Sequence, residues 1–265
     1  MPAGLVSGVR ARAGAALEER VRLLAPARRL RFELTREALE RFVPEGPALI
    51  LDAGCGDGIL SELLARRRPG WTIVAADRDP VLVARTGERL AAAGAANVTV
   101  VESDLTEDLG SGVYDAVAAV ECLEEIPDDA GALARMTAAL KPGGLLVAHV
   151  PERDWRPVLR GSDPVWRHEV RHGYSAAELR EQLERAGLEV LRVEPTCRGL
   201  VRLGQELRDR IKGSRLAVRA AAFPLLVLSV RAERLGLTWG PERALLALAR
   251  RPAGEAAAGP PPEPS

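Results

Sequence analysis

The chain has 265 residues, and its 37 acidic and 37 basic side chains give a formal net charge of zero at pH 7. This balance leaves no overall basic field of the kind that attracts nucleic acid, so we expect no nucleic-acid partner. The length suits one domain with an elaboration better than two full domains.

The three cysteines, Cys55, Cys122 and Cys197, lie far apart and form no C-x-x-C pair. Neither a disulfide framework nor a zinc knuckle is therefore indicated, and a reducing compartment is expected. The first residues lack the apolar core of a signal peptide. The sequence also contains no run of about 18 apolar residues, the length that a helix needs to span a bilayer. We expect a soluble protein in the cytoplasm.

Residues 1–47 are rich in arginine, alanine and leucine. Apolar side chains at Leu30, Leu34 and Leu39 follow helical spacing, and Pro44 ends the pattern. The segment is predicted to form a helical brace or lid.

Residues 48–61, ALILDAGCGDGILS, have the pattern of a strand, a tight loop and a helix. An apolar run ends at Asp52, and Gly54, Gly56 and Gly58 then lead into a helical pattern. Glycines permit positive φ and let a ligand approach the bare backbone, while the N–H groups at the start of a helix attract an anionic group. The stretch predicts a site for a cofactor that carries a carboxylate or a phosphate.

Strands and helices alternate after this loop. Helical spacing predicts helices at 59–68, from Pro80, at 131–140 and at 176–186, and apolar runs predict strands at 71–77, 97–104, 114–121, 145–150 and 188–193. The alternation predicts an α/β fold with a doubly wound, mostly parallel sheet, whose ligands bind at the carboxyl ends of the strands. Four acids that end predicted strands should share that rim: Asp52, Asp77, Asp104 and Glu121.

The glycine loop departs by one residue from the dinucleotide fingerprint G-x-G-x-x-G. Residues 51–58, LDAGCGDG, instead resemble the first motif of class I S-adenosylmethionine-dependent methyltransferases. Residues 121–127, ECLEEIP, are similar to that family's fourth motif, except that Glu125 stands where the family usually has His. Residues 140–144 and 244–252 resemble the turn before its fifth strand and its last, antiparallel strand.

This resemblance covers roughly residues 45–195 and implies a seven-stranded sheet with S-adenosyl-L-methionine as the cofactor. It implies that Asp77 binds the ribose and that Asp104 meets the adenine amine. Any one strand-end acid could instead cap the next helix, but four together favour a cofactor site. The residues expected to contact the cofactor are Asp52, Ala53, Gly54, Cys55, Gly56, Asp77, Arg78, Asp104, Leu105 and Glu121.

These patterns also set the expected domain boundaries. We expect the cofactor-binding core at 48–196, a helical insertion at 197–243 and the last strand of the core at 244–252. Residues 253–265 are rich in alanine, glycine and proline, and this composition predicts a disordered tail.

Residues 168–172, HEVRH, match the H-E-x-x-H pattern of zinc proteases, which requires an uninterrupted helix. Gly173 follows at once and Ser175 has the character of a helix cap, so we expect no metal here. His168 or His172 could instead act as a catalytic base beside the acceptor. The alternative is that both are ordinary loop residues.

The expected activity is methyl transfer from S-adenosyl-L-methionine to a small-molecule acceptor. We favour oxygen as the methylated atom and include lipid-like and glycan intermediates among the acceptors. Two other functions stay open: a nicotinamide-dependent oxidoreductase on a related fold, and a non-catalytic module that binds S-adenosylmethionine. The sequence predicts neither the acceptor nor the oligomeric state.

Residues 215–235 carry an apolar run flanked by arginines, and the run is too short to span a bilayer. Our favoured interpretation is a helical lid packed in the ordinary way, bent by Pro224. In the second interpretation, the apolar face meets a lipid-like acceptor or the inner face of the membrane, and the arginines suit anionic head groups.

Overall fold

The computed structural model describes residues 25–159, 170–211, 214 and 216–253. The chain divides into two compact units. The first comprises residues 1–33, 155–165 and 195–243, and the second comprises residues 34–154, 166–194 and 244–265. Most of the predicted N-terminal brace and nearly all of the predicted tail lie outside the described residues.

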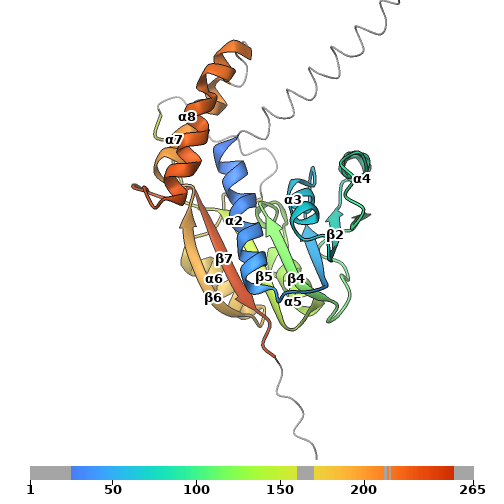
Figure 1. Ribbon diagram of the computed structural model, residues 1–265. Coiled ribbons are helices and arrows are strands. Elements are labelled where there is room, and N and C mark those ends of the chain that lie inside the picture. Colours follow the sequence, from blue (N-terminus) through green and yellow to red (C-terminus); the bar gives the residue numbers. More distant parts are fainter. Residues whose placement is uncertain (1–24, 160–169, 212–213, 215, 254–265) are drawn as a thin grey trace, which may run out of the picture. The chain divides into compact units, whose positions relative to one another are not determined.

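The second unit is built on a seven-stranded sheet with the strand order β3-β2-β1-β4-β5-β7-β6 (Figure 1). Neighbouring strands from β3 to β5 pair in parallel, and β7 runs antiparallel to β5. The predicted mostly parallel sheet with a final antiparallel strand is therefore confirmed. The strands are β1 (Ala48–Ala53), β2 (Trp71–Asp77), β3 (Val98–Glu102), β4 (Tyr114–Val120), β5 (Leu140–Pro151), β6 (Glu189–Thr196) and β7 (Ala244–Arg250).

Helices between the strands pack against the sheet: α3 and α4 against β2 and β3, α5 against β5, and α6 against β7. Two of their starts follow the sequence signals. Asp79 caps α4 by accepting from Val81 N at 2.8 Å, and Ser175 forms a capping box with Glu178 at α6. The bounds are α3 (Ile59–Arg67), α4 (Pro80–Ala92), α5 (Asp129–Ala139) and α6 (Ala176–Arg185).

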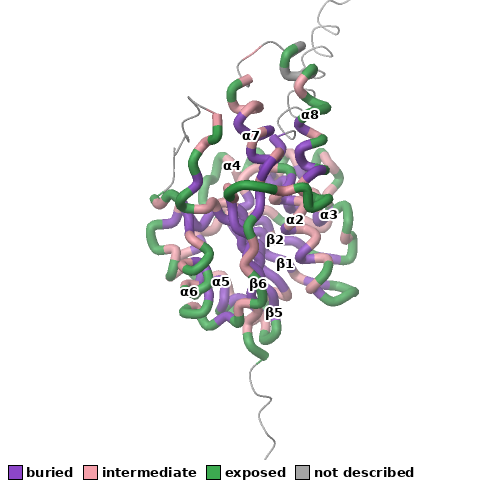
Figure 2. Tube along the Cα trace, turned by 90° about the vertical axis from the view of Figure 1, so that its left-hand side faces the viewer, coloured by how far each residue is buried: buried purple, intermediate pink, exposed green. Residues whose placement is uncertain are grey.

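The core lies in the central strands, where β1, β4 and β5 are apolar on both faces. Ile50, Ala118 and Val147 are fully buried, and Figure 2 draws much of the central part of this sheet in purple. A parallel sheet covered on both sides requires such continuous apolar runs. The polar groups that end these strands therefore gather at the rim.

Strand β5 begins five residues earlier than the sequence predicts. Its pairing with β4 jumps from Tyr114 opposite Leu140 to Ala116 opposite Leu145, so residues 141–144 bulge out of register. Gly143 takes a positive φ of 79° within this bulge. The expected turn is thus present, but as an irregularity inside a longer strand.

The first unit contains α7 (Gly199–Ile211), α8 (Leu216–Arg234) and the start of α2 (Pro26–Phe42). Helices α7 and α8 pack along each other, and a Cβ on Gly204 of α7 would lie 2.8 Å from the Ser229 hydroxyl of α8. Pro224 lies inside α8, and the helix continues through it. None of the helices in the described residues is long and apolar enough to cross a membrane.

A buried carboxylate ties an extended segment to this helix pair. Glu206 of α7 accepts from the backbone N–H of Val158 at 3.0 Å and of Leu159 at 2.7 Å. Arg202, one turn earlier, lies 3.6 Å from the same carboxylate and donates to the Pro241 carbonyl. These contacts satisfy polar groups that burial would otherwise leave without water.

Candidate functional site

The glycine loop between β1 and α3 takes a conformation that other residues rarely adopt. Gly54, Gly56 and Gly58 have φ values of 70°, 53° and 67°. A Cβ on Gly54 would lie 2.6 Å from the Cβ of Cys122, and one on Gly58 would lie 2.6 Å from Thr86. A Cβ on Gly56 would meet no described atom within 4 Å. Packing thus requires two of the glycines, whereas Gly56 borders open space.

Backbone and side-chain hydrogen bonds hold this loop in place. Cys55 N donates to the Ala76 carbonyl at 2.9 Å, and Gly56 N donates to Asp77 Oδ2 at 2.8 Å. The Thr86 hydroxyl donates to the Gly56 carbonyl at 2.7 Å. Asp77 Oδ1 accepts from Asp79 N at 3.0 Å. Because an ionised carboxylate has about four acceptor positions, Asp77 can still accept from a ligand.

Asp52 lies beneath the loop with only 2 % of its surface exposed. Its Oδ2 accepts from the Ser61 backbone at 3.1 Å and from the Ser61 hydroxyl at 2.6 Å. Burial raises the pKa of Asp52 to about 6, although both bonds from Ser61 lower it. Asp52 therefore fixes the first turn of α3, and its expected direct contact with the cofactor stays a prediction.

A further acid of the rim, Asp104, lies near the loop through its neighbours. Asp104 Oδ1 accepts from Thr106 N at 2.9 Å and from its hydroxyl at 2.7 Å, and these bonds lower the pKa of Asp104. The nearby charge of the exposed Arg78 lowers that pKa further. Leu105 is buried, 3.9 Å from the position of a Gly54 Cβ. Four residues expected at the cofactor, Gly54, Arg78, Asp104 and Leu105, thus lie in one region.

The rim also contains a paired histidine that our sequence reasoning missed. His149 is fully buried near the end of β5, and its Nδ1 lies 3.0 Å from Glu121 Oε1. Glu121 follows β4 with a φ of 53°, rare for a residue other than glycine. The signal was present in the sequence, because His149 is the one polar residue in the apolar run LLVAHV at 145–150.

His172 lies at the same rim. Arg171 N donates to the Glu124 carbonyl just after β4, and Tyr174 N donates to the Pro151 carbonyl at the end of β5. Residues 170–175 are not helical, so the uninterrupted helix required by the zinc pattern is lacking there. His172 is exposed, and His168 lies outside the described residues.

A polar cluster beneath His172 holds this segment. Asp129 Oδ2 accepts from Arg171 Nη1 at 2.9 Å and from the Tyr174 hydroxyl at 2.8 Å, and the Arg171 guanidinium lies 3.9 Å from the centre of the Tyr174 ring. Gly173 has a φ of 121°, and a Cβ there would lie 2.3 Å from the Pro151 carbonyl. The segment is therefore fixed on both sides of His172.

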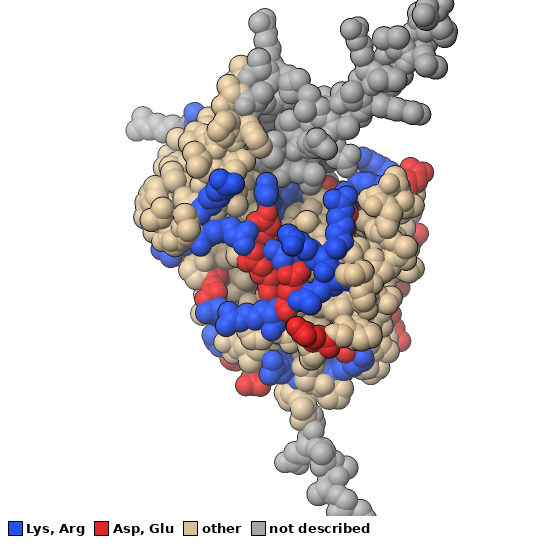
Figure 3. Space-filling model, in the orientation of Figure 1, with Lys and Arg blue, Asp and Glu red and all other residues tan. Residues whose placement is uncertain are grey.

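The face drawn in Figure 3 shows no large area of one charge sign. Figure 3 shows acidic and basic side chains interleaved on the face that it draws. Locally, however, Asp77 and Asp57 each raise the pKa of Asp52 by their charge, so the glycine loop carries a negative cluster. This local potential favours a ligand with positive charge.

The raised pKa of Asp52 predicts a pH-dependent stability. A carboxyl whose pKa is higher in the folded chain costs stability above that pKa, and the cost falls as the pH drops below about 6. Asp52→Asn removes this titration. The parent should therefore gain about 1 kcal/mol of unfolding free energy between pH 7.5 and pH 5, and the variant should not gain it. The difference in unfolding free energy, variant minus parent, is then lower at pH 5. Parallel profiles in denaturant titrations would contradict the assignment.

Comparison with known proteins adds a family match. The family described as methyltransferase domain matches residues 27–193. An uncharacterized methyltransferase of Mycobacterium tuberculosis is 38% identical over 109 residues, which cover 41% of this chain and 53% of that protein. A trans-aconitate 2-methyltransferase of Acidovorax ebreus is 30% identical over 157 residues, which cover 56% of this chain and 59% of that protein.

A solved structure supports the fold. Phosphoethanolamine N-methyltransferase 2 of Haemonchus contortus, crystallised with S-adenosyl-L-methionine, has a TM-score of 0.62 and 20% identity, covering 83% of this chain and 52% of that one. The chain spans between half and three fifths of the curated relatives named above. With the family match over most of its length, the chain belongs to the class I S-adenosylmethionine-dependent methyltransferase family.

Proposed function

We propose that this protein transfers the methyl group of S-adenosyl-L-methionine to a small-molecule acceptor, with oxygen as the methylated atom. The observation that carries the proposal is the open space at Gly56, whose bare backbone is held 2.8 Å from Asp77 at the carboxyl ends of β1 and β2. Parallel sheets bind nucleotides at such a rim.

The chain's residues fit this cofactor. Asp77 retains acceptor positions for the ribose hydroxyls, the backbone of residues 54–56 faces the methionine end, and Asp104 with Leu105 suits the adenine. Ala53 and Cys55 contribute backbone at the loop, and Glu121 lies at the end of the neighbouring β4. S-adenosyl-L-methionine carries a cationic sulfonium and an ammonium group, which suit the negative cluster of Asp52, Asp57 and Asp77.

The same cluster weighs against the nicotinamide alternative. The pyrophosphate of a dinucleotide carries negative charge and would meet three acids at this loop, which also lacks the fingerprint spacing. A non-catalytic module that binds S-adenosylmethionine has the same pocket chemistry. Only measurement of methyl transfer separates that module from an enzyme.

The cofactor supplies a methyl group that is already electrophilic. The chain's task is therefore to align the acceptor with it and to exclude water, and such alignment contributes up to about 7–11 kcal/mol in favourable cases. A hydroxyl acceptor must also lose its proton. Histidine is the side chain that most often acts as a general base, and among the described residues His172 is the exposed histidine at the rim. His168 stays a second candidate.

The Acidovorax relative, named for its action on trans-aconitate, supports an acceptor of metabolite size. An amine acceptor would not need a base, so the choice of oxygen depends on His172. Mass spectrometry of a metabolite extract incubated with the protein and labelled cofactor should reveal a product that gains one methyl group. Transfer to an oxygen atom is the expected result.

Removing the Asp77 carboxylate should weaken cofactor binding. Asp77→Ala loses charge-assisted hydrogen bonds to the ribose, worth about 1–3 kcal/mol, so affinity should fall between about fivefold and 150-fold. Calorimetry with S-adenosylhomocysteine measures this, and NAD should not bind to the parent. Unchanged affinity in a folded variant would remove Asp77 from the site.

Gly54 and Gly56 should respond differently to alanine. Gly54→Ala places a Cβ against Cys122, so it should lower the melting temperature. Gly56→Ala meets open space, so it should lower S-adenosylhomocysteine affinity more than Gly54→Ala does, at a smaller loss of stability. Both positions have positive φ, so each variant controls for the backbone strain of the other. The reverse order of effects would show that no ligand occupies the space at Gly56.

A base at His172 predicts a specific kinetic change. His172→Ala should lower kcat at least tenfold and flatten its pH dependence, because general-base catalysis typically contributes about 10²–10⁴-fold. Cofactor affinity should stay within about twofold of the parent. If the variant keeps both the rate and the pH profile, His172 is not the base. Another group then takes the proton, or the reaction needs no base.

A further inference from the structure

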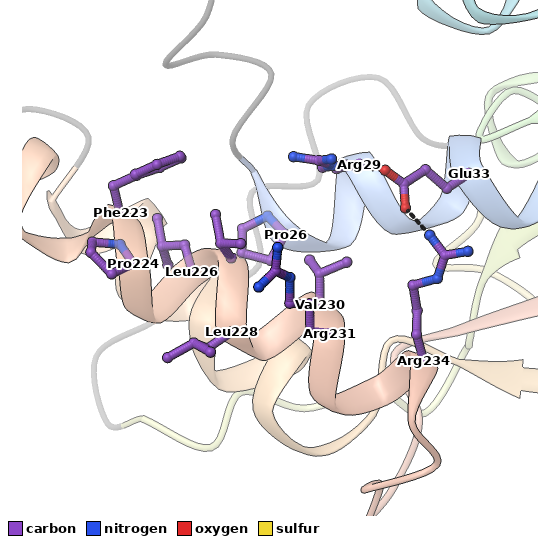
Figure 4. A pocket seen from close by; sticks show the side chains of 11 residues that line it. Pro26, Arg29, Glu33, Phe223, Pro224, Leu226, Leu228, Val230, Arg231 and Arg234 are labelled. Atoms are coloured by element: carbon purple, nitrogen blue, oxygen red, sulfur yellow. Dashed lines mark hydrogen bonds and ion pairs between the residues drawn. The ribbon is translucent and has the colours of Figure 1, made fainter.

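The helical unit contains a half-open pocket of its own (Figure 4), with a volume of about 620 Å³. It is lined by α8 and by the start of α2, and all of its residues belong to the first unit. Six apolar residues of the lining are Pro26, Phe223, Leu226, Val227, Leu228 and Val230. The volume lies in the range of pockets that bind small molecules.

The pocket has an apolar end and a basic end. Figure 4 shows Phe223 and Pro224 at one end and the ion pair of Glu33 with Arg234 at the other. The two ends are eleven residues apart on α8, or about 16 Å along a helix. A ligand that fills the pocket would therefore contact hydrocarbon at one end and charge at the other.

Positive charge exceeds negative charge in the lining. Three arginines line the pocket beside one carboxylate, Glu33, which pairs with Arg29 and Arg234 at 2.8 Å each. Arg231 is exposed, and its side chain forms no ion pair or hydrogen bond with the described residues. Arg231 and Arg234 lie in the last turn of α8, where a positive charge also interacts favourably with the helix dipole. That interaction explains the arginines but not the apolar pocket beside them.

The apolar lining is partly open to solvent. Leu226 and Val230 are buried, whereas Phe223 and Leu228 expose 39 % and 56 % of their surface. Covering such side chains stabilises a complex by about 25 cal/mol for each Å² removed from water. The lining thus combines unburied hydrocarbon with excess positive charge.

We propose that this pocket binds a single-chain amphiphile with an anionic head group, such as an alkyl phosphate. The hydrocarbon chain lies along the apolar lining towards Phe223, and the head group is bound by Arg231 beside Arg29 and Arg234. Charge complementarity selects this occupant. Two other occupants would bring more positive charge than negative: residues 1–24 contain four arginines and two glutamates, and a second copy of the lining carries three arginines and one glutamate.

Calorimetry with three probes of equal chain length tests the ligand class. Dodecyl phosphate, dodecanol and dodecyltrimethylammonium are titrated separately into the full chain, the two charged probes below their micelle concentrations and dodecanol below its solubility limit. Dodecyl phosphate should bind with one-to-one stoichiometry and at least tenfold more tightly than either other probe. Equal affinity for all three, or no binding of dodecyl phosphate, would overturn the proposal.

Two leucines of α8 provide a matched pair of variants. Leu228 lines the pocket and Leu225 does not, yet their exposures are similar at 56 % and 52 %. Leu228→Glu and Arg231→Glu should each weaken dodecyl phosphate binding at least tenfold, whereas Leu225→Glu should leave it within twofold. S-adenosylhomocysteine affinity should be unchanged in all three variants, which also shows that they fold.

The same pair separates a pocket ligand from a membrane surface. Docking onto vesicles of phosphatidylglycerol and phosphatidylcholine would use the whole apolar face, so both leucine variants would lose co-sedimentation. A pocket ligand instead makes Leu228→Glu alone defective for dodecyl phosphate. Equal loss in both variants would replace the pocket with a membrane-binding face and overturn the proposal.

Discussion

The proposed cofactor site depends on a steric constraint at the loop that follows β1. Three glycines at alternate positions take positive φ, and two of them are packed so closely that a methyl group would collide with Cys122 or Thr86. The same packing brings the loop after β1 against Cys122, which follows β4, and against Thr86 in the middle of α4. As a result the third glycine, Gly56, is held rigidly while its own surface stays open, which is how a fold presents bare backbone to a ligand.

Electrostatics add a second constraint at the same place. Burying Asp52 beneath the loop raises its pKa to about 6, so its ionised form costs stability near neutral pH. The two bonds from Ser61 to this acid in turn fix the first turn of α3. The buried charge also contributes to a negative potential that a cationic cofactor would relieve. Stability and binding are therefore linked through one carboxyl group.

The sequence predicted the fold where the signals are local. Pro80 and Ser175 mark the starts of α4 and α6, and the apolar runs ending in acids mark the strands. Features that depend on distant residues were not predictable. The early start of β5 follows from its shifted pairing with β4, and the bond from Thr86 to the Gly56 carbonyl joins residues thirty positions apart. The spacing of apolar residues along the sequence does not predict contacts between such distant residues.

The pair formed by Glu121 and His149 shows how far the site extends beyond the motifs. Glu121 has a positive φ without being glycine, a conformation that costs of order 1–3 kcal/mol. Its backbone N–H donates to the His149 carbonyl, and its carboxylate lies 3.0 Å from His149 Nδ1. Two contacts with one buried residue therefore hold Glu121 in its strained conformation. Strain of this kind persists where the surroundings enforce it. Because Glu121 directly follows β4 at the rim, its backbone bond and its contact with His149 together fix the direction of its carboxylate.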